Sequence, residues 1–320
     1  MTGMSAGHVI GVDLGGTKLL AGVVGADLVV RHRAVRPTPA EGAIELLAEV
    51  VSELADAADG DVAAVGIGMP SLVDSARNEV VWTNHLALAM TPVRDLISER
   101  LGLPVAIDND GNAALLAEHR FGAARGAEHA LMLTLGTGIG GAILVDGEIV
   151  RGAHGGAGEF GHMIVDPDGP ECPGNCPGRG CLEALASGTA LARLGERAAL
   201  EAPESALGRQ LAEGRPITGA LVTELAHDGD GFALEALAVV GYWLGLGLSG
   251  LANIFDPDVI VIGGGVGSAG DLLLEPARAQ IAARALPPVA ASVRVEPARF
   301  GEEAGMLGAA LLAWEQLAHV

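Results

Sequence analysis

The chain has 320 residues, more than one compact core usually holds, so two lobes with a cleft between them are expected. Half of the residues are hydrophobic, 48 are glycine and only 3% are aromatic, so Ala, Val, Leu and Ile must form the core with many close backbone approaches. A formal net charge of −21 argues against a nucleic-acid partner, because phosphate binding needs an excess of Lys and Arg. This composition favours an α/β fold.

The N-terminal stretch has no basic region followed by a long apolar run, so a secretory signal is not expected and the predicted location is the cytoplasm. All three cysteines lie between residues 172 and 181, which argues against a secreted disulfide scaffold. The region 236–255 is uncharged and long enough to span a bilayer. Its flanks are the acids Glu235 and Asp256, however, and its small residues Gly241, Gly245 and Ser249 recur four residues apart, as on a closely packed helix. A buried core helix, and no membrane partner, is therefore expected.

Strands and helices alternate along the chain, which predicts a mixed or parallel sheet. Two similar units, each an apolar strand, a glycine turn and a second strand, indicate a duplicated architecture. The predicted elements, in chain order, are the first such hairpin at 8–24, a helix at 43–57, a strand at 62–69, a helix near 92–101, a strand at 104–107, the second hairpin at 130–145, a glycine- and cysteine-rich loop at 154–181, helices at 182–214 and 231–253, a strand at 259–262 and a helix at 304–317.

The first glycine turn could bind an anion through its backbone N–H groups, and Asp13 before it could hold a hydrated Mg²⁺. Its residues are Asp13, Gly15, Gly16, Thr17 and Lys18. By itself such a turn is more often just a turn. It is not a P-loop, since no GKS or GKT follows, and it is not a dinucleotide fingerprint, since a strand and not a helix follows the glycines.

The second glycine turn, with Thr137 and Gly138, could face the first across the cleft and complete a phosphate clamp. A third glycine run follows the apolar strand 259–262 and includes Gly264 and Gly265. Its backbone would offer a flat surface for an adenosine, although a plain strand-to-helix turn explains it as well.

The run Asp108-Asn109-Asp110 directly follows an apolar strand. A carboxylate at a strand end that faces a cleft is well placed to be a general base. An aspartate there could equally be the N-cap of the following helix, and the residues alone leave both roles open.

Four residues of the glycine-rich loop have the ligand types of a closed Cys₃His zinc site: His162, Cys172, Cys176 and Cys181. The alternative is a set of reduced surface thiols.

Seven motifs occur in order: VDLGGTK, GIGMP, IDNDGNAA, LGTGIGGAI, GEFGH, CPGRGCLE and VIVIGGG. From about Val9 to Gly308 the chain resembles the ROK family, which includes glucokinases, fructokinases, allose kinases and N-acetylhexosamine kinases. The resemblance implies a two-lobed actin-like ATPase or hexokinase-type (ribonuclease H-like) fold. The expected small lobe is residues 1–112 with the C-terminal helix 304–320, and the expected large lobe is 113–303 with the zinc loop 154–181.

The resemblance also implies ATP-dependent phosphorylation of a hexose, glucose being the first choice and fructose, mannose or an N-acetylhexosamine the alternatives. Asp110 resembles the catalytic base. The expected sugar ligands are Gly68, Asn84, Asn109, Asp110, Glu159, His162 and Glu183. Their carboxylates, amides and imidazole suit an array of hydroxyls. ATP, Mg²⁺ and a structural Zn²⁺ are the expected cofactors, and a homodimer or homotetramer is expected.

Four features bear on the rival interpretations. The family's usual spacing C-x-C-x4-C is kept by Cys176 and Cys181 but not by Cys172, which makes Cys172 the least certain zinc ligand. The stretch 84–90 lacks the tryptophan common in the family's sugar pocket. The family's repressors carry an N-terminal winged helix, and only seven residues precede the first expected strand, which favours an enzyme over a regulator. Polyphosphate-using relatives typically lack the zinc cysteines, which favours ATP as donor.

Overall fold

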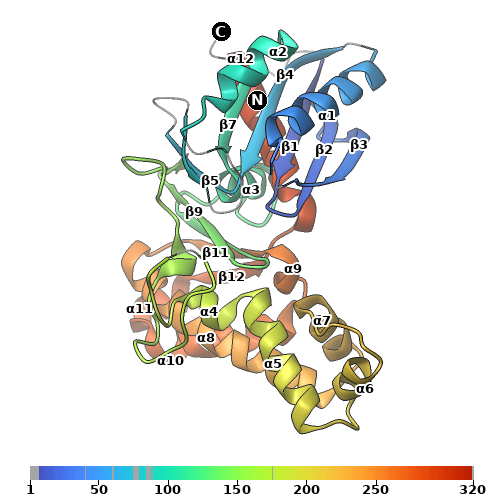
Figure 1. The fold of residues 1–320 in the computed structure, drawn as a ribbon. Coiled ribbons are helices and arrows are strands. Elements are labelled where there is room, and N and C mark those ends of the chain that lie inside the picture. Colours follow the sequence, from blue (N-terminus) through green and yellow to red (C-terminus); the bar gives the residue numbers. More distant parts are fainter. Residues whose placement is uncertain are drawn as a thin grey trace. The chain divides into compact units, whose positions relative to one another are not determined.

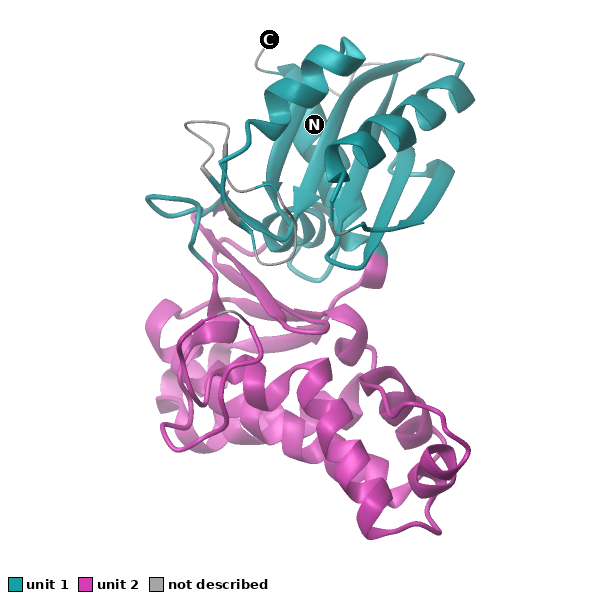
Figure 2. Cartoon of the chain, viewed as in Figure 1, with its two compact units in different colours: residues 1–125, 149–157, 303–320 teal, residues 126–148, 158–302 magenta. Residues whose placement is uncertain are grey.

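The computed structural model describes residues 7–39, 41–59, 61–74, 79–83, 88, 90–174 and 176–318. The chain divides into two compact units, coloured separately in Figure 2. Unit 1 comprises Met1–Arg125, Ile149–Ala157 and Glu303–Val320, and unit 2 comprises Gly126–Glu148 and Gly158–Glu302. The boundary expected after residue 112 falls inside a helix, Asp110–Phe121, that lies wholly in unit 1.

Unit 1 contains a five-stranded sheet in the order β3-β2-β1-β4-β7. The strands β1, β2 and β3 pair antiparallel, and β1, β4 and β7 pair parallel. A separate hairpin consists of β5 and β6. The bounds are β1 His8–Leu14, β2 Lys18–Gly25, β3 Val30–Pro37, β4 Val62–Met69, β5 Ser71–Asp74, β6 Glu79–Thr83 and β7 Val105–Asn109.

The helices in the described part of unit 1 are α1 Ala43–Ala57, α2 Val93–Leu101, α3 Asp110–Phe121 and α12 Ala304–Ala318. In Figure 1 α1 lies in front of the sheet and α12 behind it. Glycines let α12 approach the strands closely, because a Cβ on Gly11 of β1 or on Gly66 of β4 would overlap the α12 backbone. The tight backbone approaches expected from the composition are therefore present between this sheet and α12.

Unit 2 contains a second five-stranded sheet in the order β10-β9-β8-β11-β12. Its strands are β8 Ala130–Leu135, β9 Ile139–Val145, β10 Glu148–Ile149, β11 Val259–Gly263 and β12 Arg294–Pro297. The pair β8–β9 is antiparallel, and β8, β11 and β12 are parallel. A glycine hairpin followed by parallel strands thus occurs in both units, which agrees with the predicted duplication.

The helices described in unit 2 are η1 Phe160–His162, α4 Leu182–Ala186, α5 Gly188–Glu201, α6 Ala206–Ala212, α7 Gly219–His227, α8 Gly231–Phe255, α9 Gly264–Gly267, α10 Asp271–Arg284 and α11 Pro287–Ser292, with η2 Gly301–Glu303 at the boundary. The single helix expected at 182–214 is three helices. Ser187 and Ser205 have extended backbones and cap new helices, accepting hydrogen bonds from Ala190 N and Gly208 N.

The long apolar segment is α8, which is long and apolar enough to cross a membrane. One of its faces is buried, with Leu237, Val240 and Leu244 inaccessible to solvent, and it packs against α4, α5, α7 and α10. The expectation of a core helix is right for this face. Other α8 side chains are exposed, among them Ile254.

Candidate active site

Three neighbouring strands of unit 1 bring predicted site residues to the same level of the sheet. Asp13 of β1 pairs in register with Gly68 of β4, and Gly68 pairs with Asp108 of β7. These are the carboxyl ends of parallel strands, where ligands bind in open α/β sheets. A Cβ on Gly68 would lie 3.4 Å from the Cα of Asp110, so glycine keeps space open beside the predicted base.

The N-cap of α3 is Asn109, and this decides between the two roles left open for the aspartates. The Asn109 side chain accepts hydrogen bonds from Gly111 N at 2.8 Å and Asn112 N at 3.2 Å. Its amide group donates to the Ser71 carbonyl at 3.4 Å. Asp110 is the first residue of the helix and is not its cap.

The Asp110 carboxylate accepts one hydrogen bond from Gly111 N at 2.8 Å. Burial by the surrounding protein raises its pKa, and hydrogen bonds to backbone N–H groups partly oppose this rise. A raised pKa brings a carboxylate closer to the value suited to a general base at neutral pH.

Asp108 has a different role, since it is only 3% exposed and forms an ion pair with Arg151. Nε and Nη2 of Arg151 lie 2.8 and 2.7 Å from Asp108 Oδ2. Sequence reasoning did not single out Arg151, because no spacing relates it to a partner 43 residues earlier.

The first glycine turn joins β1 to β2 and is held by a backbone hydrogen bond within the turn and by the side chain of Thr38. Gly15 N donates to Lys18 O at 2.9 Å, and Thr38 Oγ1 donates to Gly15 O at 2.7 Å. Gly16 and Thr17 are exposed, so an anion could reach this turn.

Asp13 lies where β1 enters this turn. Burial raises its pKa to about 7, the negative charge of Asp110 adds to the rise, and Lys18 opposes it. The two carboxylates are therefore close enough to interact electrostatically. A cation at Asp13 would relieve this repulsion.

The second glycine turn joins β8 to β9 in unit 2. Gly188 N donates to Gly136 O at 2.8 Å, and Thr189 Oγ1 donates to Thr137 O at 2.8 Å, so the start of α5 holds the turn. Thr137 is exposed.

Glu183 of α4, one of the predicted sugar ligands, contacts this turn. It is only 8% exposed, and its Oε2 accepts a hydrogen bond from Ile139 N at 2.8 Å. A Cβ on Gly138 would overlap this carboxylate, so glycine is required for the contact.

His162 contacts a predicted sugar ligand with one ring nitrogen and the cysteine cluster with the other. Its Nε2 lies 3.9 Å from Glu159 Oε2, and its Nδ1 lies 3.5 Å from Cys172 Sγ. The structure thus brings Glu159 and His162 together, and one imidazole can serve both predicted roles.

The four predicted zinc ligands converge. The ligand atoms of His162, Cys172, Cys176 and Cys181 all lie within 4.8 Å of one another. Cys172, the least certain by spacing, is part of this cluster. Burial, then the contact with Cys176, raises the pKa of the Cys172 thiol to about 12, so a cation would be needed to stabilise its thiolate. This donor set fits a closed tetrahedral zinc site.

The third glycine run ends β11 and begins the short helix α9. Gly264 has a φ of +79°, and a Cβ there would overlap the backbone of Leu135. A cavity of about 640 Å³ in unit 2 includes both Gly264 and Gly265 in its lining. Polar and aromatic side chains that the sequence did not indicate also line it, namely Thr223, Glu224, His227, Ser268, Arg299 and Phe300.

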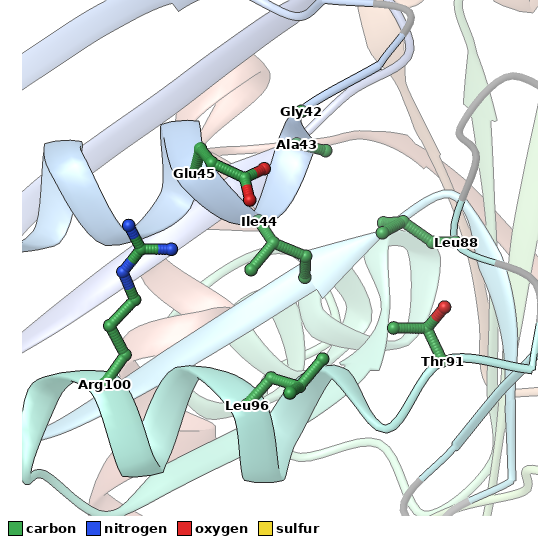
Figure 3. A pocket seen from close by; sticks show the side chains of 8 residues that line it. All are labelled: Gly42, Ala43, Ile44, Glu45, Leu88, Thr91, Leu96 and Arg100. Carbon is green, nitrogen blue, oxygen red and sulfur yellow. The ribbon is translucent and has the colours of Figure 1, made fainter.

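A further cavity, of about 390 Å³, lies between α1 and α2 in unit 1 (Figure 3). Ile44, Leu88 and Leu96 form its apolar wall, with Glu45 and Arg100 at one side. Among the described residues, none of the predicted site residues lines this cavity. One predicted sugar ligand, Asn84, lies outside the described residues, so its place in the site stays a prediction.

Comparison with known proteins agrees with the resemblance inferred from the motifs. A glucokinase of Streptomyces coelicolor is 36% identical over 318 residues, which cover 97% of this chain and 98% of the relative. A solved ROK family glucokinase from Streptomyces griseus, in complex with glucose and AMPPNP, is 37% identical with a TM-score of 0.88, covering 97% of this chain and 100% of that one. This similarity confirms the predicted fold class.

The regulators are also similar. A solved ROK family transcriptional regulator, a homologue of the E. coli MLC protein, is 27% identical with a TM-score of 0.87, and the match covers 97% of this chain and 78% of the regulator. The family model of ROK proteins matches residues 9–316. The chain belongs to the ROK family.

Proposed function

We propose that this protein is an ATP-dependent hexose kinase that phosphorylates glucose to glucose 6-phosphate. The observation that carries the proposal is the Asp110 carboxylate, which has a raised pKa and is not used as a helix cap. Full-length similarity to glucokinases supports the substrate, and the relative with bound glucose and AMPPNP supports both substrates.

In the proposed reaction Asp110 accepts the proton of a sugar hydroxyl. The hydroxyl oxygen forms a bond to the γ-phosphorus of ATP as the bond between that phosphorus and the β,γ-bridging oxygen breaks, leaving ADP. Proteins accelerate phosphoryl transfer mainly by positioning and by screening charge. A base within hydrogen-bond reach of the hydroxyl contributes a factor of about 10² to 10⁴.

The sugar hydroxyls are proposed to bind Asn109, Glu159, His162 and Glu183. Two contacts support this assignment in unit 2. Glu183 is oriented by the Ile139 amide, and His162 lies against Glu159, so these side chains are held before a ligand arrives. Gly68 leaves room beside Asp110, and Asn84 remains a proposed ligand.

The glycine turns with Lys18 and Thr137 are proposed to bind the phosphates of ATP, and the 640 Å³ cavity beside Gly264 and Gly265 its nucleoside. The cavity volume lies in the range of small-molecule sites. Asp13 is proposed to hold Mg²⁺ through water, and the ion would supply charge neutralisation at the phosphoryl oxygens.

His162, Cys172, Cys176 and Cys181 are proposed to hold a structural Zn²⁺. The loop that they close is rich in glycine and proline, so burial alone would hold it weakly. The cluster lies beside Glu183, since Cys172 Sγ is 3.9 Å from Glu183 Oε1. Fixing the loop would therefore fix two sugar ligands, His162 and Glu183.

We also propose a cytoplasmic location and a homodimer or homotetramer.

A coupled assay tests the proposal: purified protein with ATP and Mg²⁺ is given glucose, fructose, mannose, N-acetylglucosamine or N-acetylmannosamine. The highest kcat/KM is expected with glucose. Polyphosphate in place of ATP tests the donor and is expected to support little turnover. Absence of ADP formation with every sugar would refute the kinase and favour the alternative, a sugar-responsive regulator; one similar solved structure is that of a ROK family transcriptional regulator.

A further inference from the structure

Arg151 of unit 1 forms an ion pair with a buried carboxylate, that of Asp108. Its Nε and Nη2 both contact one oxygen, Oδ2 of Asp108, at 2.8 and 2.7 Å, and the Asp108 side chain is 3% exposed. Charged hydrogen bonds of this kind are about twice as strong as neutral ones and fix the geometry of both partners.

The other oxygen of Asp108 holds the start of α3. Oδ1 accepts hydrogen bonds from Asn109 N and from the buried Asn112 Nδ2, both at 2.8 Å. Asp110 lies between these two donors in the chain. Asp108 therefore connects Arg151 to the residues on either side of the proposed base.

The segment that carries Arg151, residues 149–157, is itself packed against β5. Gly155, with a φ of +75°, lies so close to Val73 that a Cβ would overlap the Val73 backbone. Ala157 N donates to Arg151 O at 3.2 Å. The same strand accepts the hydrogen bond from the Asn109 amide at Ser71 O, so β5 contacts both the Arg151 segment and the proposed sugar ligand.

From these contacts we infer that Arg151 is a positioning residue, which acts through Asp108 to hold Asp110 and Asn109 against the acceptor sugar. The inference rests on the proposed kinase function. Without Arg151, the buried Asp108 carboxylate would lose its cationic partner and would turn toward other hydrogen-bond donors or water. The start of α3, which this carboxylate holds, would then move. A displacement of about 1 Å at a catalytic group can cost about 10²-fold in rate.

The test compares Arg151→Met, Arg151→Lys and Asp108→Asn with the wild type in steady-state kinetics. For Arg151→Met we expect kcat to fall about tenfold or more and the glucose KM to rise several-fold, while the ATP KM stays within about twofold. A mere loss of folded protein would lower the apparent kcat and change neither KM. Arg151→Lys keeps the charge but not the fork of two donors, so partial rescue is expected.

The double variant Asp108→Asn/Arg151→Met should be no slower than the slower single variant, because both changes break the same pair. Arg120→Met is the matched control, since Arg120 pairs with Glu315 at 3.0 Å on the exposed surface of the same unit. If Arg151→Met does not fold, the kcat and glucose KM of Arg151→Lys are used in its place to test the inference. Normal kcat and glucose KM in the folded variant would overturn the inference. An inactive wild type would instead refute the proposed function.

Discussion

Glu183 Oε2 accepts a hydrogen bond from Ile139 N at 2.8 Å, directly after Gly138 of the second glycine turn. A residue proposed to bind the sugar is thus attached to a turn proposed to bind the phosphates. From the sequence alone, Gly138 was expected to serve only the nucleotide. Because of this contact, a substitution at Gly138 should also affect Glu183, the proposed sugar ligand.

Gly138→Ala is therefore expected to weaken glucose binding together with ATP binding. The new Cβ would overlap the Glu183 carboxylate and displace it. Titration calorimetry with glucose alone should show an affinity lower by about tenfold, the loss of roughly one charged hydrogen bond. Gly136→Ala is the control in the same turn, because a Cβ there meets no atom within 4 Å. Unchanged glucose affinity in Gly138→Ala would contradict the assignment of Glu183.

The raised pKa of Asp13 predicts a pH dependence of stability. The pKa of Asp13 is about 7 in the folded protein, against an ordinary aspartate value of 3.8, so the folded state binds the proton more tightly than the unfolded state. Protonated Asp13 therefore stabilises the folded state. This stabilisation is fully present below pH 3.8 and is lost as the pH rises toward 7. Over that window the loss amounts to about 4 kcal/mol.

Asp13→Asn should remove this loss and raise the free energy of unfolding at pH 8, measured by urea denaturation without Mg²⁺ or nucleotide. Asp27→Asn is the control. Hydrogen bonds from Arg31 lower the pKa of Asp27 to about 2, so its contribution changes only below about pH 4. If the two variants had the same stability profile between pH 5 and 8, the environment assigned to Asp13 would be wrong.

The zinc proposal predicts about one zinc per chain for a site with four protein ligands. Cys181→Ser should lose the metal and should also weaken glucose binding, because the loop holds His162 and lies beside Glu183. Elemental analysis and glucose titration measure the two effects. His154→Ala, an exposed histidine outside the cluster, should keep both. A metal-free protein with full kinase activity would exclude the zinc and leave the role of Asp110 untouched.

Periodic segments were predictable from the sequence. The helix Ala43–Ala57 and the strand Val62–Met69 have the predicted bounds, because apolar spacing and flanking turn residues mark them. The edge strand Val30–Pro37 was missed, since four of its residues are basic or histidine and its apolar alternation is weak. The helix Asp271–Arg284 was also missed, with an internal proline and low amphipathicity.

Contacts between distant segments could not be predicted from spacing. The cysteine cluster includes Cys172 despite its unusual offset, because folding of the loop and not sequence distance brings the sulfurs together. Arg151 meets Asp108 only through the tertiary structure. The role of Asn109 as N-cap required the backbone geometry of α3.

The central claim is that Asp110 is the base in phosphoryl transfer to a hexose, and Asp110→Asn tests it most directly. The amide keeps the shape of the side chain but cannot accept the proton, so kcat for glucose should fall by a factor of about 10² or more. Glucose affinity, measured by calorimetry, should remain within a few-fold. Asp56→Asn, an exposed acid on α1, is the matched control and should have normal turnover.

The pH dependence of kcat/KM gives a second test of Asp110 as the base. A base must be deprotonated, and burial raises the pKa of Asp110, so kcat/KM of the wild type should fall with decreasing pH through a pKa above the ordinary aspartate value of about 3.9. That acidic limb should be absent from the residual activity of Asp110→Asn. Near-normal turnover in Asp110→Asn, with an unchanged acidic limb, would contradict the account.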